Sequence, residues 1–205
     1  SEFFLSNNHK LLGTLMDKYD AGLSPFNTYS KQVNGSLIGR PPATIVHELS
    51  FVRLIRVEER EQQIYTVLVV ITRWRDPRLS WDPNEFGGID HIYVQYDQIW
   101  HPEVAACDSS EYTPVLPDSA VFVKINNTGH ITADRAYTVT YICEFEIANF
   151  PFDKQFCKIC FFLPMYKDQE LLLKGTFSDD LVVLRITILS SVYRLICTMY
   201  KKKHI

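Results

Sequence analysis

The sequence has no stretch long and apolar enough to cross a bilayer, because its longest apolar runs, at residues 67–71 and 160–165, are only strand-sized. It also lacks an excess of positive charge. The formal net charge is −3, whereas nucleic-acid-binding proteins usually carry a basic surface. No low-complexity tract is present, and 46% of the residues are hydrophobic, which is typical of a folded globular chain. These absences argue against a nucleic-acid partner and against extended disorder.

Motifs for catalysis are missing as well. The chain contains no nucleophile-elbow serine and no glycine loop that would cradle a phosphate, and its six histidines, at positions 9, 47, 91, 101, 130 and 204, do not cluster. Cys157 and Cys160 have the spacing of half a zinc or redox site, but a strand places residues three apart on opposite faces. With no second pair to complete a site, we expect neither an enzyme nor a metal or cofactor.

The hydrophobic periodicity predicts one helix followed by many strands. Residues 8–19 read as a short amphipathic helix, with Asn8 as its N-terminal cap and the apolar residues at helical spacing. Further along, alternation with period two runs through residues 91–100, 121–125, 137–147, 182–188 and 193–199, and residues 64–71 read as a strand buried on both faces. About ten short strands separated by turn residues are typical of a β-sandwich. With no linker or internal repeat, residues 1–205 form one predicted domain.

Two sequons indicate an extracellular setting for a chain that has five cysteines. Asn34 and Asn126 each head an Asn-x-Ser/Thr triplet without proline in the middle and are candidate glycosylation sites. Unglycosylated surface turns would give the same triplets by chance.

Cys143 and Cys157 enclose the segment CEFEIANFPFDKQFC, in which Pro151 stands between two phenylalanines and is followed by Asp153 and then Lys154. This segment resembles the signature loop of the Cys-loop receptors, the pentameric ligand-gated ion channels. Residues 74–82 (WRDPRLSWD), 97–103 (DQIWHPE) and 123–130 (VKINNTGH) are similar to nicotinic-type motifs in the same order. Residues 198–203 resemble the basic segment that enters the first membrane helix.

The resemblance implies an extracellular, ligand-facing domain with an immunoglobulin-like twisted β-sandwich fold and a short N-terminal helix. It implies a disulfide between Cys143 and Cys157, the Cys-loop at 143–157 and a pre-membrane segment at 198–205. It further implies a homo- or heteropentamer, so that four further subunits are partners. A small-molecule ligand of unknown identity would bind at the subunit interfaces, and contact with the membrane would come only through a transmembrane domain absent from this sequence.

The aromatic box that holds a quaternary ammonium in nicotinic receptors is mostly replaced. Transferred position by position, the box and its surroundings fall on seven candidate ligand-site residues: Val69, Trp100, Cys107, Phe162, Pro164, Tyr166 and Tyr193. Val, Cys and Pro have no aromatic ring to offer a cation. We therefore expect acetylcholine not to be the agonist. The stretch between residues 181 and 201 is short for the capping hairpin of the family.

The residues that the resemblance implies in gating match the family pattern more closely than the ligand-site residues do. In the family, an acid on the first β-turn pairs with the pre-membrane base, which gives Glu58 and Glu59 opposite Lys201, while Phe152 and Asp153 of the signature loop would face the membrane domain. Alternatively, Glu58 and Glu59 belong to a solvated charged turn, where an exposed ion pair contributes only about 0–1 kcal/mol.

The two remaining cysteines and the overall role leave alternatives open. Cys160 and Cys197 are candidates for a disulfide, since the family places their strands as antiparallel neighbours, although buried free thiols are the default expectation. The whole protein is expected to be a channel subunit at the extracellular side of the cell membrane. The alternatives are a secreted pentamer of the acetylcholine-binding-protein type and a modulatory subunit that binds no agonist.

Overall fold

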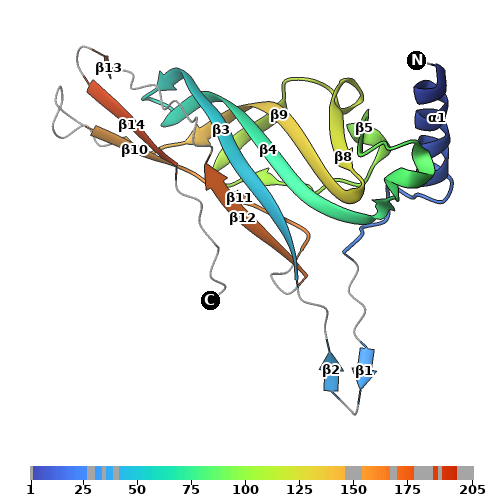
Figure 1. The fold of residues 1–205 in the computed structure, drawn as a ribbon. Helices are drawn as coiled ribbons and strands as arrows, with labels where there is room; N and C mark the ends of the chain where they lie inside the picture. Colours follow the sequence, from blue (N-terminus) through green and yellow to red (C-terminus); the bar gives the residue numbers. More distant parts are fainter. Residues whose placement is uncertain are drawn as a thin grey trace.

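The computed structural model describes residues 2–26, 31–33, 36–38, 42–145, 154–166, 170–177, 187–188 and 191–197. Its one helix, α1 (Glu2–Met16), stands at one end of a long twisted sheet (Figure 1). The strands are β1 (Lys31–Val33), β2 (Ser36–Ile38), β3 (Ala43–Glu58), β4 (Gln63–Ser80), β5 (His91–Gln95), β6 (Ala105–Ala106), β7 (Ser109–Pro114), β8 (Phe122–Asn126), β9 (Thr128–Ile142), β10 (Lys154–Ile159), β11 (Phe161–Phe162), β12 (Leu171–Phe177), β13 (Thr187–Ile188) and β14 (Ser191–Cys197). Three 3-10 turns complete the set: η1 (Pro83–Phe86), η2 (Tyr96–Gln98) and η3 (Asp118–Ala120).

The largest sheet has seven strands, in the order β12-β3-β4-β9-β8-β5, with β7 also paired to β9. Its three long strands, β3, β4 and β9, are antiparallel neighbours. A separate sheet contains β10, β14 and β13, and β6 pairs with β11. In Figure 1, β10 and β14 lie near the end of the molecule farthest from α1. These sheets confirm the predicted mainly-β, sandwich-like architecture.

The core consists of two clusters that follow the length of the sheet. The cluster nearer α1 contains Leu11, Trp74, Trp100 and Ile131, together with the inward residues of β5 and β8. The other cluster surrounds the Cys143–Cys157 bond and is built from the inward residues of β3, β4, β9 and β10. Two clusters on one continuous sheet mean that the α1 end and the disulfide end are packed by different residues.

Strand alternation is confirmed in β8, where Val123 and Ile125 are buried and Phe122 and Lys124 are exposed. In β9 the expected inward residues Val139, Tyr141 and the following Cys143 are buried, but Thr140, expected on the wetter face, is buried as well.

The expectation that residues 64–71 are buried on both faces is wrong. The residues of one face, Ile64, Thr66, Leu68 and Val70, are buried. Those of the other face, Tyr65, Val67 and Val69, are only partly covered, because β4 presents that face outward from the sheet.

The helix was expected at residues 8–19 but spans Glu2–Met16. Asn8 therefore lies inside it rather than capping it. The helix ends at Met16, and Tyr19 lies in the turn that follows, where its N–H donates to the Met16 carbonyl at 3.2 Å. Leu11 is fully buried and Leu15 and Met16 pack on the core, but Leu12 is 36% exposed.

Near the C-terminus the two strands expected to be antiparallel are parallel, with Ile159 of β10 opposite Cys197 of β14. The expected apolar stripe at 182–188 lies outside the described residues except for β13, and residues 198–205 lie outside them altogether.

Candidate ligand-binding site

A pocket of about 620 Å³ opens beside η2, between the turn after α1 and the segment at 165–166. Its walls are Ala21, Gly22, Asp97, Ile99, Trp100, His101, Glu103, Met165 and Tyr166. Two of the predicted ligand-site residues, Trp100 and Tyr166, meet here, with ring centroids 6.4 Å apart and planes at 83°. An edge-to-face pair of this kind gives a rigid apolar wall.

Trp100 is 8% exposed and is held from two sides. The Phe26 ring meets it edge-on at 5.1 Å, and the backbone N–H of Trp100 donates to the hydroxyl of Tyr19 at 3.0 Å. That hydroxyl in turn donates to Asp76 Oδ2 at 2.8 Å, so the turn after the helix is fastened both to the pocket and to β4.

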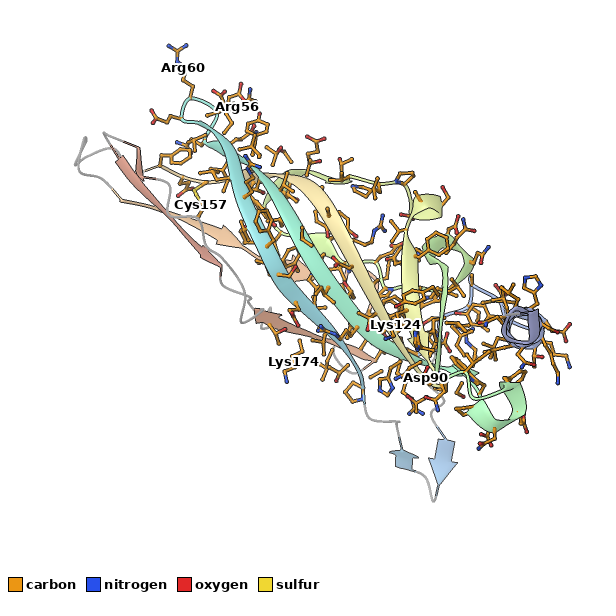
Figure 2. All side chains as sticks on the ribbon, turned by 45° about the horizontal axis from the view of Figure 1, so that its top comes forward. Arg56, Arg60, Asp90, Lys124, Cys157 and Lys174 are labelled. Atoms are coloured by element: carbon orange, nitrogen blue, oxygen red, sulfur yellow. A yellow bond between two sulfur atoms is a disulfide. The ribbon has the colours of Figure 1, made fainter. Side chains whose placement is uncertain are left out.

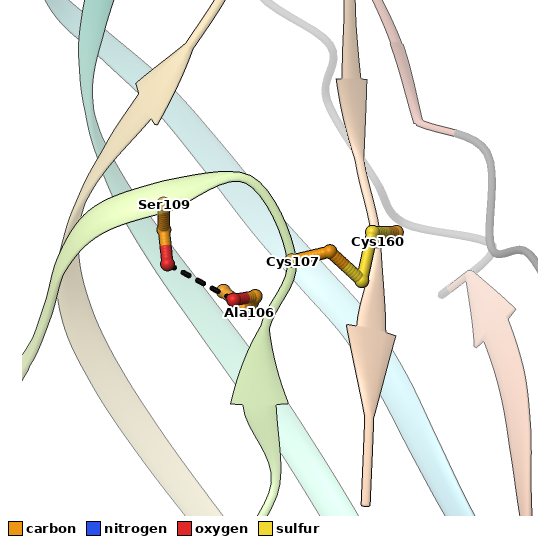
Figure 3. Close-up of a disulfide and its surroundings, with 4 residues drawn as sticks. All are labelled: Ala106, Cys107, Ser109 and Cys160. Atoms are coloured by element: carbon orange, nitrogen blue, oxygen red, sulfur yellow. Dashed lines mark hydrogen bonds between the residues drawn. A yellow bond between two sulfur atoms is a disulfide. The ribbon is translucent and has the colours of Figure 1, made fainter. Parts of the chain in front are cut away.

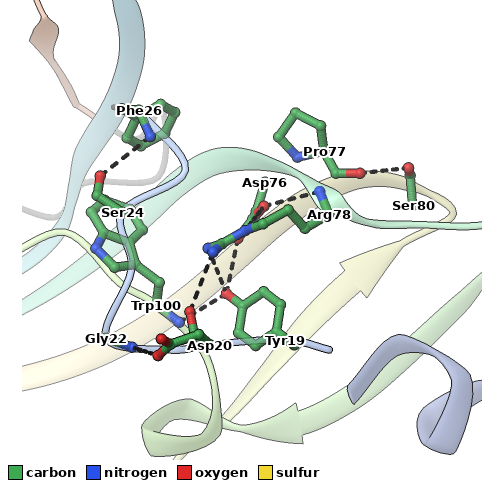
Figure 4. Close-up of polar contacts among 10 residues, drawn as sticks. All are labelled: Tyr19, Asp20, Gly22, Ser24, Phe26, Asp76, Pro77, Arg78, Ser80 and Trp100. Carbon is green, nitrogen blue, oxygen red and sulfur yellow. Dashed lines mark hydrogen bonds and ion pairs between the residues drawn. The ribbon is translucent and has the colours of Figure 1, made fainter. Parts of the chain in front are cut away.

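Asp76 organises this network (Figure 4). Its carboxylate is fully buried, and the Arg78 guanidinium donates to both of its oxygens, with Nε 3.0 Å from Oδ1 and Nη2 2.7 Å from Oδ2. Arg78 also covers the Tyr19 ring at 4.5 Å and donates to the Asp20 carbonyl at 3.2 Å. A buried carboxylate needs such pairing, because an isolated charge would be strongly disfavoured there. Burial raises the pKa of Tyr19 above its usual range.

The polar groups of the pocket are acidic or neutral. Asp97 and Glu103 supply carboxylates, and His101 stacks on Tyr96 with centroids 4.0 Å apart and planes at 21°. Burial lowers the pKa of His101 below its usual range, against the opposing pull of Asp118, Glu103 and Asp97. At neutral pH this imidazole is therefore uncharged.

Behind the pocket, a buried guanidinium fills a space between tyrosines. Arg135 of β9 lies over the rings of Tyr96 at 4.4 Å and Tyr137 at 5.3 Å, and donates to Asp118 Oδ1 at 2.6 Å. Tyr137 stacks on Tyr112 at 4.4 Å. Burial raises the pKa of all three tyrosines, so their phenols stay neutral. The sequence analysis missed this arrangement, for which cation–π geometry supplies the attraction.

Cys107, a predicted ligand-site residue, is joined to Cys160 by a disulfide, with Cα atoms 5.3 Å apart (Figure 3). The Cys107 N–H also donates to the Cys160 carbonyl at 2.9 Å. The expected candidate pairing of Cys160 with Cys197 is thus wrong, as is the default of free thiols at Cys160. The reason is that β6 pairs with β11, which places Cys107 next to Cys160.

The other ligand-site candidates do not converge on the pocket. Val69 is half-buried on the outward face of β4, opposite Ala136 and Phe51. Phe162 is 38% exposed on β11, and Pro164 is exposed. The side chain of Tyr193 lies outside the described residues, although its backbone pairs with Gln155 of β10.

The predicted signature disulfide, Cys143–Cys157, is present, with Cα atoms 5.3 Å apart and both residues buried. The Cys143 N–H donates to the Gln62 carbonyl at 2.7 Å, which ties the start of this loop to the turn between β3 and β4. Residues 146–153, including Phe152 and Asp153, lie outside the described part of the chain.

Of the gating candidates, Glu58 ends β3, and Arg56 Nε lies 3.3 Å from its carboxylate at the surface. Glu59 follows in the exposed turn, while Lys201 lies outside the described residues. In Figure 2, Arg56 and Arg60 are at the same end as Cys157, and Asp90 and Lys124 are at the opposite end.

The glycosylation candidate Asn126 sits in a tight turn between β8 and β9. Its Oδ1 accepts from the Thr128 hydroxyl at 2.7 Å and from the His130 N–H at 2.9 Å. Asn34 lies outside the described residues. Within the residues described, no group of His, Cys, Asp or Glu is arranged to hold a metal, and no helix there is long and apolar enough to cross a membrane.

A model of the neurotransmitter-gated ion-channel ligand-binding domain matches residues 8–194. The chain belongs to this family. It is a Cys-loop receptor extracellular domain of nicotinic type, from a family of channel receptors rather than enzymes.

Several relatives are similar to this receptor domain. "Proton-gated ion channel subunit pbo-6" of Caenorhabditis elegans is 31% identical over 132 residues, covering 64% of this chain and 31% of the relative. "Acetylcholine receptor subunit beta-type acr-3" of the same organism is 27% identical over 191 residues, covering 93% and 37%. "Neuronal acetylcholine receptor subunit beta-2" of Carassius auratus is 32% identical over 145 residues, covering 70% and 31%. The receptor domain therefore spans no more than 37% of the length of these relatives.

Proposed function

We propose that this receptor domain senses an extracellular ligand other than acetylcholine, as part of a pentameric channel subunit that couples to a transmembrane pore. The observation that carries the proposal is the state of Cys107. At the position where the family pattern expects a ligand-facing tyrosine, this chain has Cys107, whose side chain forms a disulfide with Cys160. Val69 and Pro164 likewise offer no aromatic ring, so a quaternary ammonium would lose most of its cation–π partners.

The coupling part of this proposal is supported by the far end of the molecule. The turn that carries Glu58 and Glu59 is hydrogen-bonded, through Gln62, to Cys143 at the start of the signature loop. A displacement of this turn would therefore also move the start of the signature loop. In the assembled receptor, these acids would meet the basic Lys201 segment, and Phe152 and Asp153 would face the membrane domain.

Electrophysiology of the full-length receptor tests the ligand. We expect no current and no micromolar binding with acetylcholine or nicotine, measured beside a nicotinic subunit that responds in the same cells. Micromolar or tighter binding of either compound would contradict the proposal. Surface assembly without current under any ligand, alone or with other subunits, would instead support the modulatory subunit.

Proton sensing is a second candidate, favoured by His101. Its imidazole lines the pocket, stacks on Tyr96 and is uncharged at neutral pH, so acidification adds a positive charge beside Asp97 and Glu103. One relative, at 31% identity, is named as a proton-gated channel subunit. A step to acid pH should change the current of the wild-type receptor, and His101→Gln should shift that pH dependence. Identical pH responses of the two would exclude His101 as the sensor.

A further inference from the structure

The two disulfides of the receptor domain attach one short stretch, residues 157–160, to different elements. Cys157 joins Cys143 at the end of β9, and Cys160 joins Cys107 in the turn between β6 and β7. Their surroundings differ. Cys143 and Cys157 are 3% and 6% exposed inside the second core cluster, whereas Cys107 and Cys160 are both only partly buried.

Access decides which disulfide a dissolved thiol attacks, because the thiolate must reach a sulfur atom. The turn that carries Cys107 is open to solvent: Asp108, which follows it, is exposed and adopts a left-handed backbone with φ of 48°. The Ser109 hydroxyl closes the turn locally by donating to the Ala106 carbonyl at 3.0 Å (Figure 3). That bond holds the shape of the turn.

The Cys107–Cys160 bond also joins covalently two segments whose strand pairing is short. β6 and β11 pair through only two residue pairs, Ala106 with Phe161 and Ala105 with Phe162, beside the single hydrogen bond from Cys107 to Cys160. A two-stranded pairing of this length has little stability of its own. Cleavage of the disulfide would therefore loosen this contact selectively.

We propose that Cys107–Cys160 is a thiol-exchange site, which a small extracellular thiol opens while Cys143–Cys157 stays closed. The attacking thiolate forms a mixed disulfide with one cysteine and releases the other as a thiol. A second small thiol then resolves the mixed disulfide, so that the small thiols are oxidised to their own disulfide and both cysteines are reduced. Opening releases residues 105–109, two residues beyond the pocket carboxylate Glu103, from β11.

Limited reduction of the 205-residue chain with dithiothreitol tests this site without any channel activity. Aliquots are alkylated over time and the modified cysteines are mapped by mass spectrometry. We expect Cys107 and Cys160 to become labelled at least about tenfold faster than Cys143 and Cys157, as their access differs. Equal rates, or faster labelling of Cys143 and Cys157, would overturn the proposal.

Amide hydrogen exchange on the partly reduced chain gives the second readout. Protection should fall in residues 105–109 and 159–162 and stay unchanged in β4 and in residues 128–140 of β9, which pair with β4. The double variant Cys107→Ser with Cys160→Ser should show the same local loss in its oxidised state, and Cys197→Ser, which leaves both bridges intact, should not. If the double variant fails to fold, or if reduction exposes the whole sheet, the bond is structural and the exchange-site proposal is wrong.

Discussion

His47 gives the sharpest test of how the core responds to acid. It lies on the inward face of β3 and is 1% exposed, with Nδ1 2.9 Å from the Thr72 hydroxyl and its ring 4.7 Å from that of Phe161. Within the described residues, Nε2 has no hydrogen-bond partner. Burial lowers the pKa of His47 from 6.5 to about 4. A proton on this ring would bring an unpaired charge into the core.

The magnitude follows from linkage. Because the folded pKa lies below the unfolded one, the unfolded chain binds a proton that the folded chain rejects whenever the pH is between the two values. The contribution of His47 to stability is therefore complete above pH 6.5 and is lost as the pH falls toward 4. The integrated loss of unfolding free energy is about 2 kcal/mol between pH 7.5 and pH 5, and about 3 kcal/mol by pH 4.

Urea unfolding followed by tryptophan fluorescence, at pH 7.5, 6, 5 and 4, measures this loss. His47→Gln is the control, since glutamine keeps a polar group for Thr72 but does not titrate in this range. Carboxylates titrate in both proteins, so their effect cancels in the difference. We expect wild type to lose about 2 kcal/mol more than the variant between pH 7.5 and pH 5. Parallel stability–pH curves would refute the assignment.

Three further predictions concern polar and backbone features of the fold, each measured by urea unfolding at neutral pH. Asp76→Asn should cost about 3 kcal/mol, because it leaves a partly buried guanidinium without its charge partner; a loss below about 1 kcal/mol would contradict this. Gly129→Ala should cost more than Gly88→Ala, since both glycines have positive φ but only at Gly129 would a Cβ strike the Asp76 backbone; equal losses would show that the close approach has no effect. Arg135→Lys should lower the unfolding free energy by about 2 kcal/mol, because an ammonium cannot cover the Tyr96 ring and also hydrogen-bond to the Asp118 carboxylate; an unchanged stability would indicate that the guanidinium shape is irrelevant there.

Local patterns in the sequence predicted the strands well where one face is buried and the other wet. The alternation from Val121 to Ile125 is an example, because side chains that point alternately to the two faces of a strand give the sequence a period of two. The prediction from local patterns was wrong at residues 64–71, where the valines on the outward face are as hydrophobic as the residues that face the core. Hydrophobicity alone does not say which face of a sheet has a neighbour.

The candidate site was predictable only in part. Trp100 and Tyr166 do share a pocket, but the Cys107–Cys160 bond was not foreseen. Its two cysteines are 53 positions apart, and only the short pairing of β6 with β11 brings them together. Arg135 was missed for a related reason, since its tyrosine partners come from η2 and from its own strand. The residues around Asp118 contain no local motif that would predict its ion pair with Arg135.

The two bridges on residues 157–160 also limit how this part of the molecule can move. Cys157 and Cys160 are three positions apart in an extended segment, so their side chains leave it on opposite sides. A segment tethered on both sides cannot turn about its own long axis without dragging both partners along. With both bonds closed, a movement of this segment would carry the end of β9 and the turn at 106–109 with it. Opening Cys107–Cys160 would leave the segment tethered to Cys143 alone, so that the turn at 106–109, next to the pocket, would no longer be covalently coupled to the signature loop.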